Sequence, residues 1–364
     1  MCGEHRKDYC SMKKYIGCDA HTRYSIFVSL REDGGCDPAV RIEHNELEME
    51  RYLKQLPAGT PVALESSGNW YWLVRAMEEA GLDPRLAHAL EAKKRMPGRN
   101  KTDHLDAKGL ALMLRNGSLP EVWIPPANLL DLRDLMRTRL ATRQQGSELK
   151  CRILAALRRY GVRREEEGAD LFAESRRPKL AIAIARLPQE CRIATTEEWA
   201  LLRELEQHLE AMEQRIRQRI ASLGWVRLLK TLPGVGTILG STIYLEIGEV
   251  SRFPSPEHLA SYAGLVPTVH ASGGKMWQGP TPRSANHFLK WAFIEAANVI
   301  VAHQKGWADK HVVRLYQRLK ANKCHGKATT AVARHLAESS WWILTKKQGY
   351  REPALATMSS SKNG

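Results

Sequence analysis

Residues 15–43 decide the fold of the first part of the chain, and they read YIGCDAHTRYSIFVSLREDGGCDPAVRIE. Residues 15–19 and 24–30 are short, apolar runs, and the second is rich in β-branched and aromatic side chains, a composition typical of strands. The Gly-Gly pair at 34–35 predicts a turn, and residues 39–43 have the pattern of a third strand. The sequence therefore predicts an antiparallel three-strand meander.

The next sixty residues alternate between helical and strand-like periodicity. Apolar residues recur at helical spacing or form short buried runs, which predicts a helix, a strand, a helix, a strand and a closing helix at 45–56, 61–65, 69–80, 86–90 and 103–114. The order βββαβαβα matches the ribonuclease-H-like (RuvC-like) fold of the α/β class. We assign this domain to residues 14–118 and expect residues 1–13 to form a flexible extension.

Composition limits the class of protein and its partners. The 364 residues carry 55 Lys and Arg against 40 Asp and Glu, a net charge of +15, which favours a polyanion such as nucleic acid. The sequence contains no run of 18 apolar residues, so it predicts no membrane span. The first residues lack the apolar core of a signal peptide. The seven Cys are scattered without a C-x-x-C pair, so the sequence predicts a protein of the reducing cytoplasm.

Four acidic residues occupy positions suited to a metal site in this fold. Asp19 ends the first predicted strand, Glu65 ends the fourth, and Asp103 and Asp106 stand three residues apart on one helix face. Taken singly, each acid is more often a turn former, a helix cap or an ion-pair partner. Together they supply four hard oxygen donors, which suit two Mg²⁺ ions. Neighbouring cations add charge for binding phosphate, and they are Lys93, Lys94, Arg95, Arg99 and Lys101.

Residues 126–222 follow a Pro-Pro pair and predict a region of long helices. Apolar residues form stripes with nearly heptad spacing, and the outer face of the first helix is cationic. The second long helix is expected to start at the capping residues Thr195 and Thr196. We expect the two helices to pair as an antiparallel coiled coil, within the chain or between subunits, that links two domains. A solvated helical hairpin without nucleic-acid contact is an equally good interpretation.

Residues 223–350 predict a third, mostly helical domain, and residues 351–364 a disordered tail. The segment TLPGVGT at 231–237 has the pattern of a helix-hairpin-helix, in which the backbone around Gly234 and Gly236 would bind a phosphate. An ordinary helical turn remains an alternative. A Gly/Ser-rich segment, HASGGK at 270–275, interrupts the helices.

Five segments in this order resemble the DEDD-type insertion-sequence transposases, a family that includes the DNA invertase Piv. They read GCDAHT at 17–22, ALESSG at 63–68, KTDHLDA at 101–107, LPGVG at 232–236, and YAGLVP at 262–267 with Ser272 and Gly273. They span nearly the whole chain, and their combination is far more specific than any one of them.

The resemblance implies an RNA-guided DNA recombinase. It implies that Asp19, Glu65, Asp103 and Asp106 form the metal-binding tetrad for Mg²⁺, and that Ser272 is a nucleophile that forms a serine–phosphate intermediate. Its implied partners are a non-coding guide RNA encoded by the element, donor DNA and target DNA, in the bacterial cytoplasm and at the nucleoid. A homo-oligomer, dimer or tetramer, would form composite active sites from different subunits.

The segment after the serine departs from the family pattern. The family has Gly where this chain has Ala285, within the sequence PRSAN at 282–286. Lys275, Arg283 and Asn286 remain candidates for phosphate contacts. Ser284 is a second candidate nucleophile with a poorer context.

Two other functions fit the same residues. A Mg²⁺-dependent Holliday-junction resolvase or nuclease would use the four acids without a covalent intermediate. A non-catalytic nucleic-acid-binding scaffold would use only the helix-hairpin-helix and the coiled coil. Metal dependence separates the scaffold from both enzymes, and dependence on Ser272 and on RNA separates the two enzymes.

Overall fold

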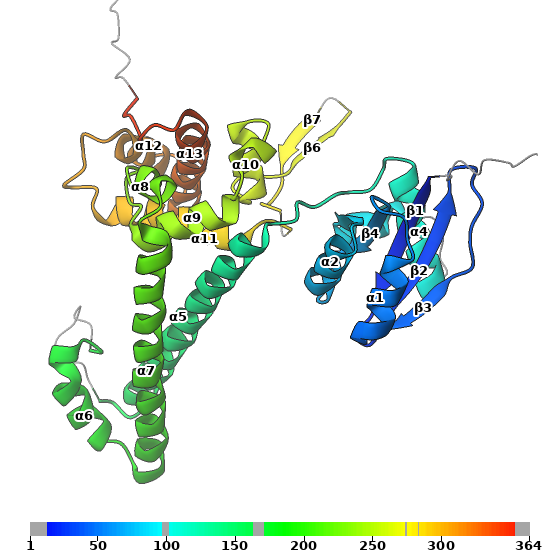
Figure 1. Ribbon diagram of the computed structural model, residues 1–364. Helices are drawn as coiled ribbons and strands as arrows, with labels where there is room; N and C mark the ends of the chain where they lie inside the picture. The colour runs from blue at the N-terminus through cyan, green and yellow to red at the C-terminus, as the bar shows by residue number, and fades with distance from the viewer. Residues whose placement is uncertain (1–12, 97–101, 163–170, 274, 283, 354–364) are drawn as a thin grey trace, which may run out of the picture. The chain divides into compact units, whose positions relative to one another are not determined.

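The computed structural model describes residues 13–96, 102–162, 171–273, 275–282 and 284–353. The chain divides into two compact units, Met1–Ile124 and Pro125–Gly364. Figure 1 labels the helices and strands of both units.

The N-terminal unit is built on a mixed five-stranded sheet. Its strands are β1 (Lys14–Ala20), β2 (Tyr24–Arg31), β3 (Val40–Glu43), β4 (Pro61–Glu65) and β5 (Asp83–Ala87), in the order β3-β2-β1-β4-β5. β1, β2 and β3 pair antiparallel, whereas β4 and β5 run parallel to β1. The predicted meander is confirmed, and the arrangement is consistent with the ribonuclease-H-like fold.

Helices cover both faces of this sheet. The helices are α1 (Glu46–Lys54), α2 (Trp70–Glu79), α3 (Ala89–Arg95) and α4 (Asp103–Arg115). Side chains of α1 and α2 share a buried cluster with Ile16, Cys18, Val62 and Leu64. Side chains of α3 and α4 pack with Ala63. Because successive strand residues point to opposite faces, α1 and α2 lie on one face and α3 and α4 on the other.

Gly17 lets α4 lie directly on β1. A Cβ at this position would stand 1.9 Å from the carbonyl oxygen of Ala107 and 2.7 Å from the backbone nitrogen of Ala111. Both alanines are fully buried, so small residues on both elements permit the close approach. This contact fixes the height of α4 over the strand that ends in Asp19.

The fifth strand lies three residues earlier than expected. The prediction of a strand at 86–90 is wrong at its end, because α3 begins at Ala89 and the ring of His88 accepts from the Glu91 amide. Parallel pairing with β4 extends β5 back to Asp83 and across Pro84. A proline is tolerated there because β5 is an edge strand, which the local sequence does not reveal.

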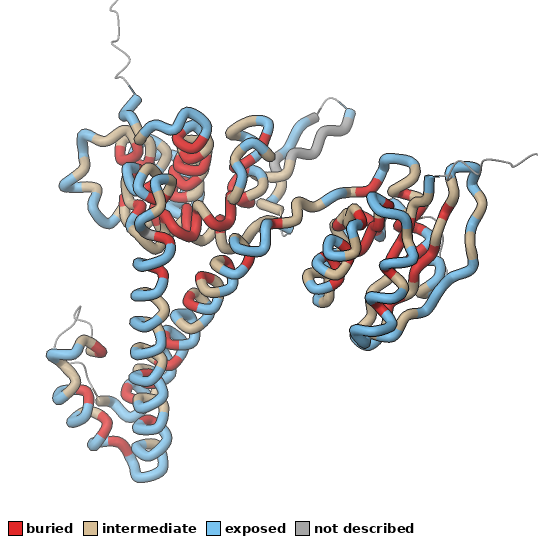
Figure 2. Tube along the Cα trace, viewed as in Figure 1, coloured by how far each residue is buried: buried red, intermediate tan, exposed pale blue. Residues whose placement is uncertain are grey.

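Two long antiparallel helices dominate the first part of the C-terminal unit. α5 (Ala127–Arg159) and α7 (Gln189–Ile216) lie side by side in Figure 1, with η1 (Glu174–Arg176) and α6 (Arg177–Ala185) between them in sequence. Leu149, Ile153 and Leu202 are buried in their contact, where both tubes in Figure 2 carry red segments. The pairing of two long helices is confirmed, and a coiled-coil geometry stays a prediction.

The expected start of the second long helix is wrong. α7 begins at Gln189, after Pro188, and Thr195 is a buried residue inside the helix. The Thr196 hydroxyl donates to the carbonyl of Arg192, one turn earlier. A threonine hydroxyl can cap the start of a helix or, inside the helix, donate to a carbonyl one turn earlier. A Thr-Thr pair alone therefore does not identify a cap.

The remaining C-terminal elements form a helical core and a two-stranded ribbon. They are η2 (Arg217–Ala221), α8 (Gly224–Leu229), α9 (Thr237–Ile247), η3 (Val250–Arg252), α10 (Pro256–Tyr262), β6 (Val269–Ser272), β7 (Lys275–Gln278), α11 (His287–Ala302), α12 (His311–Lys320) and α13 (His325–Lys346). α9, α11 and α13 carry most of the buried residues, seen as red segments in Figure 2. The predicted mostly helical domain is confirmed, and its Gly/Ser-rich interruption is an antiparallel ribbon.

Among the described residues, no helix has both the length and the apolar character needed to cross a bilayer. Residues 351–353 of the expected disordered tail are described, and the Glu352 carboxylate accepts from the amide of His311 at the start of α12. Residues 1–12 and 354–364 lie outside the described residues.

Candidate functional site

Asp19 and Glu65 lie at the same edge of the sheet and on the same face. β1 and β4 are parallel neighbours, with Gly17 opposite Ala63 and Cys18 opposite Leu64. One residue further along, the register sets Asp19 opposite Glu65. The alternation of side chains places both acids on the face that α4 covers, since Gly17 meets α4 and Ala63 packs with it.

The first turn of α4 brings the other two acids to this edge. Thr102 caps the helix, and its hydroxyl oxygen accepts from the Leu105 amide at 3.4 Å. Asp103 and Asp106 occupy the first turn, where the helix dipole favours negative charge. Because α4 is held against Gly17, this turn lies close to Asp19.

His21 joins two of the acids. Its Nε2 lies 3.1 Å from Oδ2 of Asp19 and 3.1 Å from Oδ2 of Asp103. Single ligand atoms of these three residues all lie within 4.8 Å of one another, which is the arrangement of a metal site. The Tyr24 hydroxyl donates to the same Asp103 oxygen at 3.0 Å.

The surroundings of Asp19 disfavour its negative charge. Burial raises the pKa of this carboxyl, the adjacent His21 opposes the rise, and the charges of Asp106 and Asp103 add to it. Like-charged carboxylates this close together repel, and a divalent cation among them removes that repulsion. The Asp19 side chain is 20% exposed and that of Asp103 is 40% exposed, so the site is open to solvent.

The donor set therefore fits a divalent metal ion. Asp19 and Asp103 each offer a carboxylate oxygen to one point, Asp106 adds negative charge near Asp19, and Glu65 stands one strand away. The neighbouring His21 offers a nitrogen atom or a hydrogen bond to the bound carboxylates. The four acids were predicted from the sequence, and the structure brings all four to one end of the sheet.

Sequence reasoning missed His21 and Tyr24. The Tyr24 ring stacks on His21 with centroids 4.6 Å apart, and the Asn69 amide donates to the His21 carbonyl. The Arg41 guanidinium lies 3.7 Å from the centre of the Tyr24 ring. A histidine two residues after a strand-end aspartate was the available signal.

The basic residues predicted beside this site differ in availability. Lys93 is exposed in the last turn of α3, Lys94 pairs with Glu91 at 2.7 Å, and Arg95 donates to the Ser118 carbonyl. Arg99 and Lys101 lie outside the described residues.

Ser272 is the last residue of β6, in the C-terminal unit. It pairs with Lys275 across the ribbon, and Gly273 in the turn between them has φ of +55°. That backbone region favours glycine, so the turn sets the end of the strand at the serine. Ser284 is exposed in the following loop, and Arg283 lies outside the described residues.

Asn286 is occupied by contacts within the protein. Its side-chain oxygen caps α11 by accepting from the Leu289 amide at 2.9 Å. Its amide group donates to Oε2 of Glu246 at 2.8 Å and to the Tyr262 hydroxyl at 3.2 Å. The side chain thus holds the loop that follows the ribbon, and its donors point to protein atoms.

Glu246 is a buried carboxylate at the centre of this network. It is 1% exposed, and Arg137 of α5 bonds both its oxygens, at 2.8 and 2.9 Å. Burial acts to raise its pKa, but the bonds and charges of Arg137, Asn286 and Arg133 outweigh burial and lower the pKa. Arg133 also donates to the backbone carbonyls of Leu245 and Glu246. Sequence reasoning missed this network because Arg133 and Arg137 lie more than a hundred residues from the carbonyl and carboxylate groups that they bond.

Two glycines and Ala285 have packing roles. A Cβ at Gly234, where φ is +75°, would stand 2.3 Å from the Ala296 carbonyl oxygen of α11. A Cβ at Gly264 would stand 2.5 Å from that of Ala285, so the alanine that departs from the family pattern packs against a glycine. Gly236 precedes α9 and faces open space. The helix-hairpin-helix stays a prediction.

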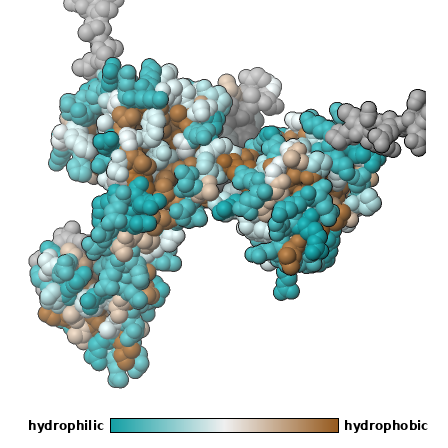
Figure 3. Space-filling model, viewed as in Figure 1, coloured by the Kyte–Doolittle hydropathy of each residue, from teal (hydrophilic) through white to brown (hydrophobic). Residues whose placement is uncertain are grey.

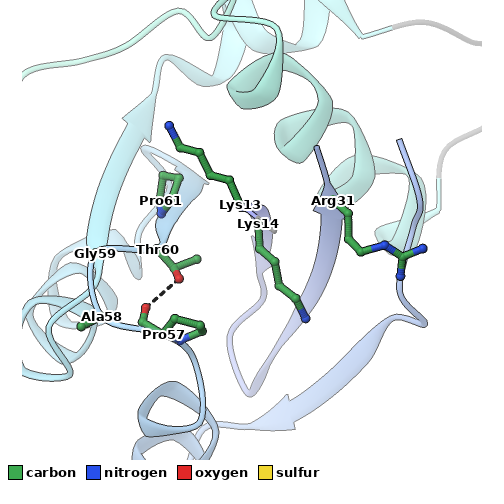
Figure 4. A pocket seen from close by; sticks show the side chains of 8 residues that line it. All are labelled: Lys13, Lys14, Arg31, Pro57, Ala58, Gly59, Thr60 and Pro61. Atoms are coloured by element: carbon green, nitrogen blue, oxygen red, sulfur yellow. Dashed lines mark hydrogen bonds between the residues drawn. The ribbon is translucent and has the colours of Figure 1, made fainter. Parts of the chain in front are cut away.

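A cavity of about 330 Å³ lies at the other end of the N-terminal sheet. Figure 4 shows its lining, which includes Lys13, Lys14 and Arg31. Lys14 and Arg31 both pair with Asp37, at 3.1 and 2.8 Å. β1 begins at this cavity and ends near Asp19, so the cavity is separate from the acidic site.

Two family models match successive parts of the chain. A model of DEDD transposases of the IS110 type, described as "Transposase", matches residues 16–162. A model described as "Transposase IS116/IS110/IS902 family" matches residues 226–312. The first match contains the acidic site, and the second contains the ribbon and Glu246.

Similar proteins support the same assignment. The chain is 25% identical to the transposase for insertion sequence element IS1111A of Coxiella burnetii, over 80% of this chain and 79% of that protein. It is 21% identical to the transposase for IS1328 of Yersinia enterocolitica, over 91% and 96%. It is 31% identical to the pilin gene-inverting protein of Moraxella bovis, over 34% and 38%. With acids at one sheet edge and both family models in order, this chain belongs to the IS116/IS110/IS902 family of insertion-sequence transposases.

Proposed function

We propose that this transposase is an RNA-guided recombinase that cuts and rejoins DNA through a serine–phosphate intermediate. The observation that supports it best is the convergence of Asp19, Asp103 and His21 within 4.8 Å, beside a strand register that brings Glu65 to the same edge. Acids that repel one another at an open site suit phosphate chemistry assisted by a cation.

Asp19, Glu65, Asp103 and Asp106 would hold Mg²⁺, as two ions. Bound there, the ions would neutralise charge on a phosphodiester and lower the cost of forming an alkoxide. His21 would orient the carboxylates of Asp19 and Asp103, since its ring lies against both.

Ser272 would be the nucleophile. Its Oγ bonds to phosphorus as one bond between phosphorus and a deoxyribose oxygen breaks, the serine loses its proton, and the leaving oxygen gains one. The new phosphoserine ester conserves the bond energy, so rejoining by another deoxyribose hydroxyl needs no ATP. The open space at Gly273, where an added Cβ would meet no atom within 4 Å, supports this role.

The partners would be donor DNA, target DNA and a guide RNA encoded by the element. The net charge of +15 supports a nucleic-acid complex. Lys93, Lys275, Arg283 and the backbone at Gly236 are the proposed phosphate contacts. A dimer or tetramer would combine the acids of one subunit with the serine of another, as the family resemblance implies.

The test is formation of a covalent adduct. The protein is incubated with RNA transcribed from the flanks of its element, labelled donor and target DNA, and Mg²⁺, and denaturing gels are run. We expect a protein–DNA adduct that requires RNA and disappears in Ser272→Ala. The matched control Ser284→Ala should retain it.

Other results would replace this proposal. Metal-dependent cleavage without an adduct, unchanged in Ser272→Ala, would identify a junction resolvase or nuclease. Binding without any cleavage, insensitive to Asp19→Asn, would identify a non-catalytic scaffold.

A further inference from the structure

The turn between α12 and α13 carries an unusual concentration of positive charge. No Asp or Glu lies between Asp309 and Glu338, whereas seven Lys or Arg do. The chain as a whole has 55 basic against 40 acidic residues, so this segment is far more basic than the average.

The positive charges lie outside because the apolar residues of both helices face inward. Val312, Val313 and Tyr316 of α12 are buried in the C-terminal core, as are Ala328 and Val332 of α13. The cations at the end of α12, in the turn and at the start of α13 are exposed; they are Arg318, Lys320, Lys323 and Lys327. We call these four residues the α12–α13 basic surface. Figure 3 shows hydrophilic residues over much of this helical part.

In the part of the chain that the structure describes, no acidic side chain forms an ion pair with the α12–α13 basic surface. Among the ion pairs formed by the described residues, none includes Arg318, Lys320, Lys323 or Lys327. On the same two helices, Arg334 pairs with Glu338 at 2.7 Å. The long helices differ too, since Arg139, Lys150 and Arg152 of α5 each pair with a glutamate of α7.

The turn that presents these cations is anchored to the core. The hydroxyl of Tyr316 and Nδ1 of His325 lie 2.9 Å apart, which ties the end of α12 to the first residue of α13. The Tyr316 ring is 6% exposed and meets His325 edge-on. The four cations therefore project from a backbone fixed at both sides, and a rigid array loses less entropy on binding.

We propose that the α12–α13 basic surface binds the phosphate backbone of duplex DNA, independently of sequence. Lysine and arginine without acidic partners are the side chains that neutralise phosphates. No Phe, Trp or Tyr occurs from Gln317 to Ser340, so this surface lacks the aromatic platforms that single-stranded nucleic acid stacks on. DNA is the nucleic acid on which the transposase family acts, and the inference rests on that part of the proposed function.

The test measures how salt affects binding. Full-length wild-type protein and the variant Arg318→Gln, Lys320→Gln, Lys323→Gln, Lys327→Gln are titrated against a fluorescent duplex DNA of unrelated sequence at several salt concentrations. Each phosphate contact contributes roughly 0.9 to the slope of log K against log salt. We expect this negative slope to become smaller in magnitude by about 2–4, and the affinity at 0.1 M salt to fall at least tenfold.

Matched variants separate this role from a general effect of charge or folding. Arg334→Gln removes a cation of α13 that already pairs with Glu338, and its slope should match that of the wild type. A variant with the three lysines changed to arginine keeps the charge and should bind normally. The four-glutamine variant and the three-arginine variant should both unfold at the wild-type temperature, because the side chains that they change are exposed.

Two results would overturn the inference: an unchanged slope in the four-glutamine variant, or a change confined to an RNA duplex of the same length. The adduct assay is separate from this measurement. If the wild type forms no adduct but the slope changes as expected, the recombinase proposal fails and the DNA surface stands.

Discussion

The two units each gather acidic and basic side chains around one point, with opposite outcomes. In the N-terminal unit, Asp19 and Asp103 share one histidine, the pKa of Asp19 is raised, and solvent reaches the site. In the C-terminal unit, Glu246 is buried, bonded on both oxygens by Arg137 and by Asn286, and its pKa is lowered.

This difference in burial and pairing distinguishes a site that suits a ligand from a contact that holds helices together. The carboxylate of Glu246 has its charge and hydrogen bonds satisfied within the protein, so it stabilises the packing of α5 against α9 and α11. The acids near Asp19 repel one another, so a cation from outside would relieve the repulsion and complete their arrangement. The sign of the pKa shift distinguishes the two cases, although both positions are conspicuous clusters of charge.

The largest effect is expected at the acidic site. Asp19→Asn should lower recombination by a factor on the order of 10⁴, about 5 kcal/mol, because it removes a metal ligand that stabilises developing charge. The measurement is the rate of adduct formation in a single turnover. Asp33→Asn, an exposed acid in the turn after β2, is the control and should retain the wild-type rate. Equal rates for Asp19→Asn and wild type would show that the acids near Asp19 are not a functional site, and the contrast with the buried network at Glu246 would fail.

The next effect concerns stability. Glu246→Gln should lower the free energy of unfolding by about 3–5 kcal/mol, because it leaves the Arg137 charge without its buried partner. Urea denaturation measures the change. Glu198→Gln breaks the ion pair with Arg152, whose side chain is 64% exposed, and should cost no more than about 1 kcal/mol. Similar losses of unfolding free energy in both variants would contradict the role of Glu246 as a buried ion-pair partner that holds helices together.

The Glu246→Gln variant should also change how the stability of the protein responds to acid. Because the pKa of Glu246 is lowered by folding, the stability that it contributes is complete above its ordinary pKa of 4.5 and is lost as pH falls through the folded value. The wild type should therefore lose stability more steeply than Glu246→Gln as pH falls below about 4.5. Urea midpoints at a series of acidic pH values test this, and parallel curves would refute it.

A smaller effect is expected from the histidine between the acids. His21→Asn should raise the Mg²⁺ concentration that gives half-maximal activity by roughly 10–100-fold, because the carboxylates lose the ring that orients them. Activity should recover at saturating metal. His104→Asn, an exposed histidine on α4, serves as the control. An unchanged metal requirement would show that His21 does not orient the ligands.

The smallest effect is the direct stabilisation by metal. Mg²⁺ at ten times its dissociation constant should stabilise the N-terminal unit by about 1.4 kcal/mol, which raises its unfolding temperature by roughly 3–6 °C. Calorimetry of the full-length protein with and without Mg²⁺ measures the shift. Asp106→Asn should abolish it, whereas Glu246→Gln should leave it intact. A shift that persists in Asp106→Asn would place the metal elsewhere.

Local patterns in the sequence were sufficient for the meander and for the order of the later elements apart from α3, and they set the four acids near strand ends and on one helix face. Strand periodicity and short turns report the backbone directly, and an i, i+3 spacing sets Asp103 and Asp106 on one face wherever the helix packs. The pattern failed at the fifth strand, because Asp83, Pro84 and Arg85 read as a loop and become a strand by pairing with β4. It failed also at Thr195, where a capping residue lies inside a helix.

The sequence by itself determined which residues are available for chemistry: a strand-end aspartate and glutamate, a helix with two acids, a serine beside a glycine turn, and an excess of positive charge. Only the tertiary structure decided that His21 joins Asp19 to Asp103, that Asn286 bonds to Glu246, and that the cations after Tyr316 form no ion pair with another described residue. The physical reason is that spacing along the chain predicts contacts within an element. Contacts between elements depend on how closely two backbones approach, and here that is set by Gly17 beneath α4 and by Gly234 beneath α11.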